Sequence, residues 1–117
     1  MPRHDFSDLL DRYPDTIAAM DEEFTSHEFI LALAQGQQRL YIEALYAYRD
    51  VTHKGAEAPF QIVHGFLAKH LHDFDGLVDL AGIGYGSEDI FGNPQRCARW
   101  RKLVSSQKVG TTEGMKR

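Results

Sequence analysis

The chain has 117 residues, of which 43% are apolar and 26% charged. This composition is typical of a single globular domain and excludes disorder of the whole chain, because enough apolar surface exists to offset the ordering entropy. No apolar run reaches the roughly 18–20 residues that a membrane-spanning helix needs, so we expect no membrane association.

Charge is unevenly distributed along the chain, whose net charge is −4. Residues 1–50 hold four basic and ten acidic residues, whereas residues 91–117 hold seven basic residues and one acidic residue. An acidic body with a basic end can contact an anionic partner, or it can dock its own end onto its body. Cys97 is the single cysteine and residues 1–5 lack the apolar segment of a signal peptide, so we expect a cytoplasmic protein.

Two short helices are predicted at the start of the chain. Apolar residues at helical spacing predict the first helix over 5–12, with Asp5 as its cap. Pro14 then fits the first turn of a second helix, which we expect to end near Phe24.

The strongest helical segment follows. Thr25 and Glu28 have the spacing of a capping box, in which a hydroxyl residue is followed three residues later by a glutamate. The apolar stripe beyond them keeps its phase across Gly36, so the pattern favours one long helix over about 26–49. A break or kink at Gly36 is the main alternative, because glycine costs about 1 kcal/mol relative to alanine in a helix.

The middle of the chain is predicted to contain a loop and a further helix. Residues 50–58 lack an apolar period and contain a glycine, which is typical of a mobile loop. Pro59 then begins a helix over about 59–73, whose predicted inward stripe consists of Phe60, Val63, Leu67, Leu71 and Phe74.

The last third is expected to alternate between turns and helices. A short helix is predicted over 75–80, and the glycine-rich run 82–86 is predicted to be a connecting loop. Ser87 is expected to cap a single turn. Asn93 and Pro94, a cap residue followed by a first-turn proline, predict a final helix over 94–104.

These elements predict an all-α fold, an irregular bundle of five or six helices. We expect one helical domain over 1–104, with the helices at 26–49 and 59–73 packed at its centre. Residues 105–117 are polar and without a period, and are expected to form a flexible basic tail.

A cluster of histidines is the first candidate site, consisting of His64, His70, His72 and Asp73. Two metal-binding histidines on a helix need a spacing of three or four residues, and the spacings of six and two found here place the rings about 240° and 200° apart. We therefore favour histidines at the edge of the core over ligands or catalytic bases. A site completed by the distant His27 or His53 stays open.

The predicted C-terminal helix is the second candidate site, since it carries Arg96, Arg99, Arg101 and Lys102. Such a helix could lie along phosphates, where basic side chains release counterions. The acidic character of the whole chain instead favours a solvated helix whose arginines pair with the acidic body. Cys97 lies on the expected buried face, which favours an inert thiol over a nucleophile.

No catalytic motif and no cofactor motif is recognised, so the sequence favours a non-enzymatic interaction module. The partner would be another protein or a second copy of the chain, and the basic helix could also contact nucleic acid. Tyr41, Tyr46 and Tyr48 lie on the most apolar helix and suit either the core edge or a homodimer interface. The alternative is a small enzyme or metal-binding protein that uses the His64, His70 and His72 region.

Overall fold

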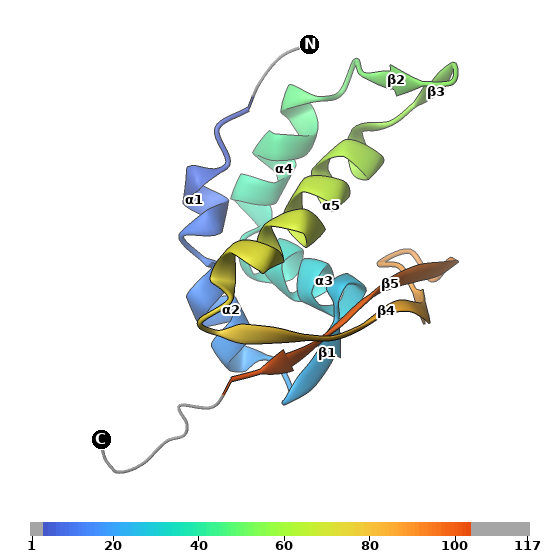
Figure 1. The fold of residues 1–117 in the computed structure, drawn as a ribbon. Coiled ribbons are helices and arrows are strands. Elements are labelled where there is room, and N and C mark those ends of the chain that lie inside the picture. Colours follow the sequence, from blue (N-terminus) through green and yellow to red (C-terminus); the bar gives the residue numbers. More distant parts are fainter. Residues whose placement is uncertain (1–3, 104–117) are drawn as a thin grey trace.

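The computed structural model describes residues 4–103 and shows a mixed fold of helices and sheet (Figure 1). The elements in chain order are α1 (Ser7–Leu10), α2 (Tyr13–Ala19), β1 (Glu23–Thr25), α3 (Ser26–Gly36), α4 (Gln38–Ala47), β2 (Thr52–His53), β3 (Ala56–Glu57), α5 (Pro59–Lys69), the 3-10 helix η1 (His70–Phe74), β4 (Val78–Glu88) and β5 (Pro94–Lys102). The prediction of an all-α bundle of five or six helices is therefore wrong.

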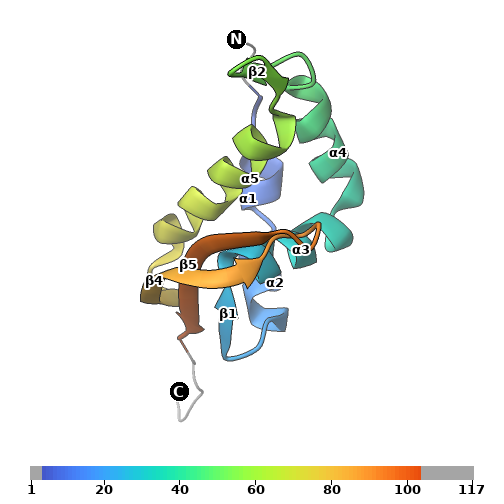
Figure 2. The ribbon, with the colours of Figure 1, turned by 90° about the vertical axis from the view of Figure 1, so that its right-hand side faces the viewer.

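Three strands form an antiparallel sheet in the order β1-β5-β4 (Figure 2). The short β1 pairs with the far end of the chain, so that Phe24 lies opposite Trp100. A separate two-stranded ribbon, β2–β3, replaces the loop expected over 50–58. Its turn uses Lys54 and Gly55, both with positive φ (54° and 81°), and glycine tolerates this conformation without steric cost.

The first half of the chain follows the sequence signals closely. Pro14 lies in the first turn of α2, as predicted. The N-cap residue of α1 is Phe6 rather than the predicted Asp5, although Asp5 accepts a hydrogen bond from the Ser7 backbone N–H (2.9 Å). The capping box of Thr25 and Glu28 is confirmed at the start of α3. Phe24, however, belongs to β1 rather than to the end of the second helix.

The long helix predicted over 26–49 is two helices. α3 ends at Gly36, Gln37 leaves the helical conformation (φ −129°, ψ 55°), and α4 begins at Gln38. The alternative of a break at Gly36 is therefore the correct one. The apolar stripe gave no sign of this break, because one non-helical residue changes the helix direction without removing apolar residues from the stripe.

The last third of the chain departs most from the prediction. The short helix over 75–80 and the glycine loop over 82–86 are both replaced by β4. Two register shifts against β5 each add one residue to β4, between Leu80 and Gly82 and between Gly82 and Tyr85. A strand is recognised in a sequence by apolar and polar residues that alternate every two positions. In β4 this pattern is absent, because glycines occupy alternate positions and the two bulges shift the phase.

The final helix predicted over 94–104 is the strand β5. Pro94 was interpreted as the first residue of a helix, but proline is equally tolerated as the first residue of a strand. Basic residues three apart imitated a helix face. The turn before β5 is held by Asp89 rather than by Ser87, which lies within β4.

One core joins the helices to the sheet. Leu33, Val63 and Leu67 are fully buried, as their inward stripes predict, whereas Phe60, expected on the same stripe as Val63, is 43% exposed. Phe24, Val78 and Trp100 extend this core onto the sheet. The longest helices, α3 and α5, have 11 residues each, and within residues 4–103 no helix could cross a bilayer. The predicted domain of residues 1–104 stays a prediction, and the tail expected over 105–117 lies outside the described residues.

Candidate functional site

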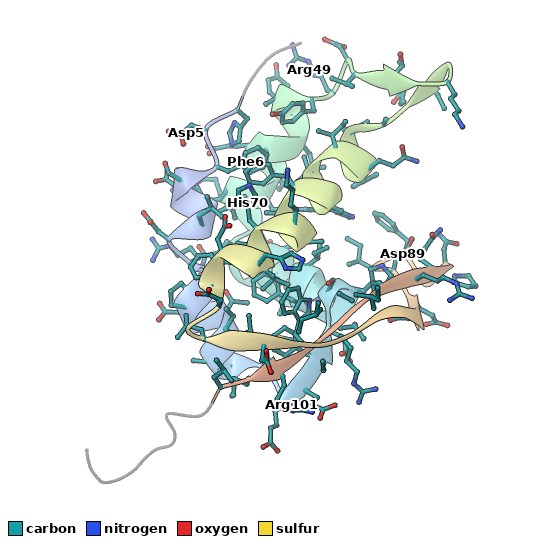
Figure 3. The ribbon with its side chains drawn as sticks, in the orientation of Figure 1. Asp5, Phe6, Arg49, His70, Asp89 and Arg101 are labelled. Atoms are coloured by element: carbon teal, nitrogen blue, oxygen red, sulfur yellow. The ribbon has the colours of Figure 1, made fainter. Side chains whose placement is uncertain are left out.

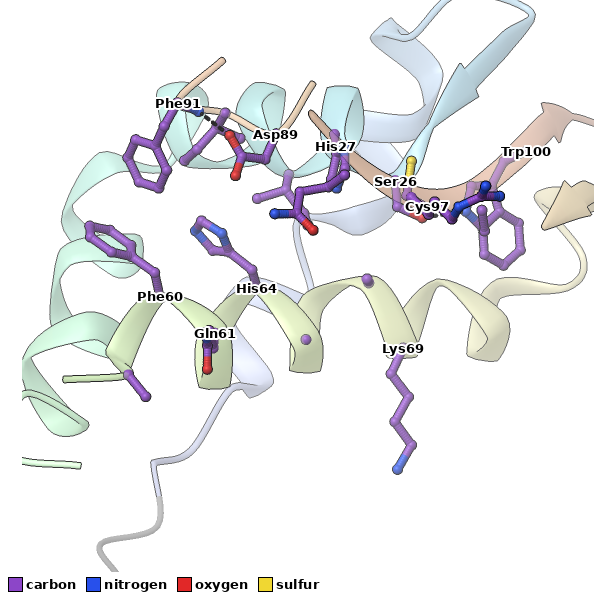
Figure 4. Close-up of a pocket in the computed structure, with 18 of the residues that line it drawn as sticks. Ser26, His27, Phe60, Gln61, His64, Lys69, Asp89, Phe91, Cys97 and Trp100 are labelled. Atoms are coloured by element: carbon purple, nitrogen blue, oxygen red, sulfur yellow. Dashed lines mark hydrogen bonds between the residues drawn. The ribbon is translucent and has the colours of Figure 1, made fainter. Parts of the chain in front are cut away.

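A groove of about 660 Å³ runs between α5 and the β4–β5 hairpin (Figure 4). This volume lies within the range of pockets that bind small molecules or a few side chains of a partner. Phe60, Phe91 and Asp89 stand at one end, and Cys97 and Trp100 at the other. Because the walls come from α3, α5 and the hairpin, only the tertiary structure assembles the site.

Two small residues on α5 leave the groove open. Gly65 and Ala68 both line it, and neither projects a long side chain across it. A Cβ atom placed on Gly65 would meet no other group within 4 Å. The space next to Gly65 is therefore unoccupied. Glycine at this position lowers the stability of the helix by about 1 kcal/mol relative to alanine.

An aromatic cluster forms one end of the groove. The rings of Phe60 and Phe91 meet edge to face with 4.7 Å between centroids, and His64 lies 5.6 Å and 6.1 Å from them. Phe60 is 43% exposed and Phe91 is 53% exposed. Two large apolar rings thus face solvent at the mouth of a groove, which is typical of a contact surface.

His64 is hydrogen-bonded to Tyr41 of α4. The hydroxyl of Tyr41 lies 2.6 Å from Nε2 of His64, and the two rings are stacked. Burial lowers the pKa of His64, although the charge of Asp89 opposes this effect, and burial raises the pKa of Tyr41. Both groups are therefore neutral near pH 7, and one hydrogen bond joins the Tyr41 hydroxyl to Nε2 of His64.

Asp89 shapes the loop that carries Phe91. Its Oδ1 accepts hydrogen bonds from the backbone N–H groups of Phe91 (2.9 Å) and Asn93 (3.0 Å). The bond from Asn93 is the main reason that the pKa of Asp89 lies below its ordinary value. A charged carboxylate is therefore fixed beside the exposed ring of Phe91.

His27 and Ser26 enter the groove from the first turn of α3. The Ser26 hydroxyl accepts a hydrogen bond from the Trp100 indole N–H at 2.9 Å, which ties the helix to the sheet. Nδ1 of His27 is buried and has no hydrogen-bond partner within residues 4–103. Buried polar atoms are usually paired, so this nitrogen is a polar atom that a ligand could satisfy.

The predicted histidine cluster is divided by the structure. His64 and His72 both line the groove, and His72 meets the Trp100 ring edge to face. His70 instead contacts the Phe66 ring in a tilted arrangement, and its Nδ1 lies 2.5 Å from a carboxylate oxygen of Asp73, far from Asp89 (Figure 3). Among the described His, Cys, Asp and Glu side chains, no group of three or more could hold a metal ion.

The four basic residues of the predicted helix likewise lie apart and contact different groups. Because 94–102 is a strand, Arg99 and Arg101 lie beside β1, where both contact the carboxylate of Glu23 (2.9 Å and 3.5 Å). Arg96 donates to the Gly84 carbonyl. Lys102 donates to the carbonyls at the end of α2, those of Ala18 and Met20. The single basic face expected for a helix does not exist.

Sequence reasoning missed most of the groove. It placed Phe60 in the core rather than in a site, assigned no functional role to Gly65, Asp89 or Phe91, and mentioned His27 only as a distant partner. One local signal was present, since Asp89 followed by Gly92 is typical of a turn held by a carboxylate. No protein-family model, curated protein or solved structure matches this chain.

Proposed function

We propose that the protein is a non-enzymatic binding module whose groove between α5 and the β4–β5 hairpin receives a segment of a partner protein. The observation that carries this proposal is an open groove above Gly65 with two exposed phenylalanines, Phe60 and Phe91, at its mouth. Burying these rings under a partner would contribute favourable free energy, roughly 25 cal/mol per Å² of apolar surface.

The polar groups of the groove favour binding over catalysis. His64 and Asp89 already hold structural hydrogen bonds, to Tyr41 and to the backbone of the hairpin loop. Within the described residues, Cys97 makes no hydrogen bond to a histidine that could activate its thiol. We also propose a cytoplasmic location, as the sequence leads us to expect.

The test begins with peptides selected from a random phage-displayed library on the wild-type protein. Their affinity is then measured for the Gly65→Leu variant, whose side chain fills the groove. Leucine meets no obstacle at its Cβ and has a higher helix propensity than glycine, so this variant should fold at least as stably as the wild type. We expect the selected peptides to bind it at least about tenfold more weakly.

Gly36→Leu is the matched control, because Gly36 is also helical, has open space at its Cβ position and does not line the groove. Its affinity for the peptides should equal that of the wild type. Equal binding to the wild type and to Gly65→Leu would refute the proposal. So would a selection that yields no binding peptide.

Self-association is a second candidate, favoured by one face of α4. Ile42 and Tyr46 are 61% and 63% exposed, and the Arg49 guanidinium lies 3.9 Å from the centre of the Tyr46 ring. Tyr41 and Tyr48, by contrast, pack against the core. Sedimentation analysis of the wild type and of Tyr46→Glu tests this version, and a wild type that stays monomeric at high concentration would end it. The nucleic-acid version is dropped, since it rested on a basic helix that is a strand.

A further inference from the structure

We infer that the aromatic end of the groove takes an arginine side chain of the partner segment, stacked on Phe60 or Phe91 and paired with Asp89. This inference rests on the proposed function and names the chemistry of the occupant. It follows from the exposed rings, the charges around them and the neutral state of the neighbouring histidine.

The exposed faces of Phe60 and Phe91 suit a cation. The two rings meet edge to face, and both keep about half of their surface exposed to solvent. The electron-rich face of an aromatic ring attracts a guanidinium group, as Arg49 over Tyr46 illustrates on α4. In the described part of the chain, no lysine or arginine is placed over Phe60 or Phe91.

The charge at this end of the groove is negative. Asp89 lies beside Phe91, and Glu57 of β3 also lines the groove. Hydrogen bonds from the hairpin backbone keep Asp89 ionised, while burial keeps His64 neutral, so His64 does not supply a competing positive charge. Of the lysine and arginine residues in the lining, Lys69 points away from the groove (Figure 4) and Arg96 is bonded to Gly84. The histidines His27 and His72 also line the groove, and His27 is near enough to Asp89 to act on its charge.

Arginine fits this arrangement better than lysine does. Its guanidinium group is planar, so it can lie flat on a ring while its N–H groups reach a carboxylate at the edge. Oδ1 of Asp89 accepts from two backbone donors and the Asn93 side chain also contacts this carboxylate, so a guanidinium would use the remaining lone pairs of Oδ2.

The experiment is a titration of the isotope-labelled protein with N-acetyl-arginine methylamide, followed by amide chemical shifts. We expect saturable shifts at the N–H groups of Phe91 and Asn93, which donate to Asp89. The citrulline analogue has the shape of arginine without its charge, and should bind about tenfold more weakly.

Three variants locate the site. Asp89→Asn keeps an oxygen that can accept both backbone bonds but removes the charge, and should weaken arginine binding about tenfold. Phe91→Leu removes one ring face and should weaken it roughly threefold. Glu88→Gln removes the neighbouring exposed charge, which does not line the groove, and should leave binding unchanged.

Equal shifts with citrulline, unchanged arginine binding in Asp89→Asn, or the absence of a saturable shift would each overturn the inference. These results leave the proposed function standing if the selected peptides still depend on Gly65. Conversely, peptides that ignore Gly65 would remove the proposed function whatever the arginine titration shows. The two failures are therefore distinguishable.

Discussion

Tyr13 is a residue whose burial has a measurable consequence. Its side chain is fully buried, and its hydroxyl donates to the Leu67 carbonyl of α5 at 2.6 Å. Phe29 and Phe74 pack against the ring. Burial, with a smaller contribution from the charge of Asp73, raises the pKa of Tyr13 well above its ordinary value. Folding therefore favours the neutral form of Tyr13.

Replacing Tyr13 by phenylalanine should lower the free energy of unfolding by about 1–2 kcal/mol at pH 7, because the Leu67 carbonyl loses a donor. The unfolded chain releases this proton near pH 10, before the folded chain does, so the contribution of Tyr13 is complete below that pH and is lost above it. Urea unfolding at neutral and alkaline pH should thus show a smaller alkaline loss for Tyr13→Phe than for the wild type.

Tyr46→Phe is the control for this prediction, since Tyr46 is largely exposed. It should lose stability at alkaline pH as the wild type does. An identical alkaline loss in Tyr13→Phe and Tyr46→Phe would contradict the role given to the buried hydroxyl.

At the scale of elements, the junction between β1 and α3 depends on the hydrogen bonds that cap the helix. The Thr25 N–H donates to the Glu28 side chain at 2.8 Å, and the Glu28 N–H donates to the Thr25 hydroxyl at 3.1 Å. Thr25 is also the last residue of β1, where it lies opposite Arg99 of β5. One residue therefore ends a strand and begins a helix, so the cap fixes where α3 leaves the sheet.

Thr25→Ala should lower the free energy of unfolding by roughly 0.5–2 kcal/mol, the usual loss when a helix cap is removed. Thr25→Ser keeps the hydroxyl and should retain most of that stability. Chemical unfolding of both variants gives the comparison. The capping role would be untenable if the serine variant lost as much stability as the alanine variant.

The elements also show how far local patterns reach. Val63 and Leu67 were assigned to a buried stripe because a helix places residues three and four apart on one face. β5 carries a similar signal in Trp100, buried between two exposed or half-exposed arginines, but its basic residues three apart fitted a helix as well. For a short segment, period alone does not separate a strand from a helix.

At the scale of the whole molecule, the C-terminal strand ties the sheet to the helical layer. Trp100 donates to Ser26, and Lys102 donates to two carbonyls at the end of α2, across more than 70 residues of sequence. The backbone N–H of Leu103 also donates to the Leu77 carbonyl. Losing the sheet would expose the side of the core that Phe24 and Trp100 cover, so sheet and helices should unfold together.

This expectation can be checked with the single tryptophan, Trp100. Its fluorescence reports on the sheet, whereas far-ultraviolet circular dichroism at 222 nm, an estimate of helix content, reports on the helices. We expect the two urea transitions to coincide, because Trp100 is buried at the junction of both layers. A fluorescence change at distinctly lower urea than the circular dichroism change would show that the hairpin unfolds by itself.

The sequence alone determined where most helices lie, the cap of α3 and the buried faces of α3 and α5, because helical hydrogen bonds join residues only four apart. The tertiary structure decided the strands, because Phe24 pairs with Trp100 across the length of the chain. It also decided the groove, where His27, His64 and Asp89 arrive from separate segments. No local periodicity predicts that these residues lie close together, because their proximity depends on how the hairpin packs against α5.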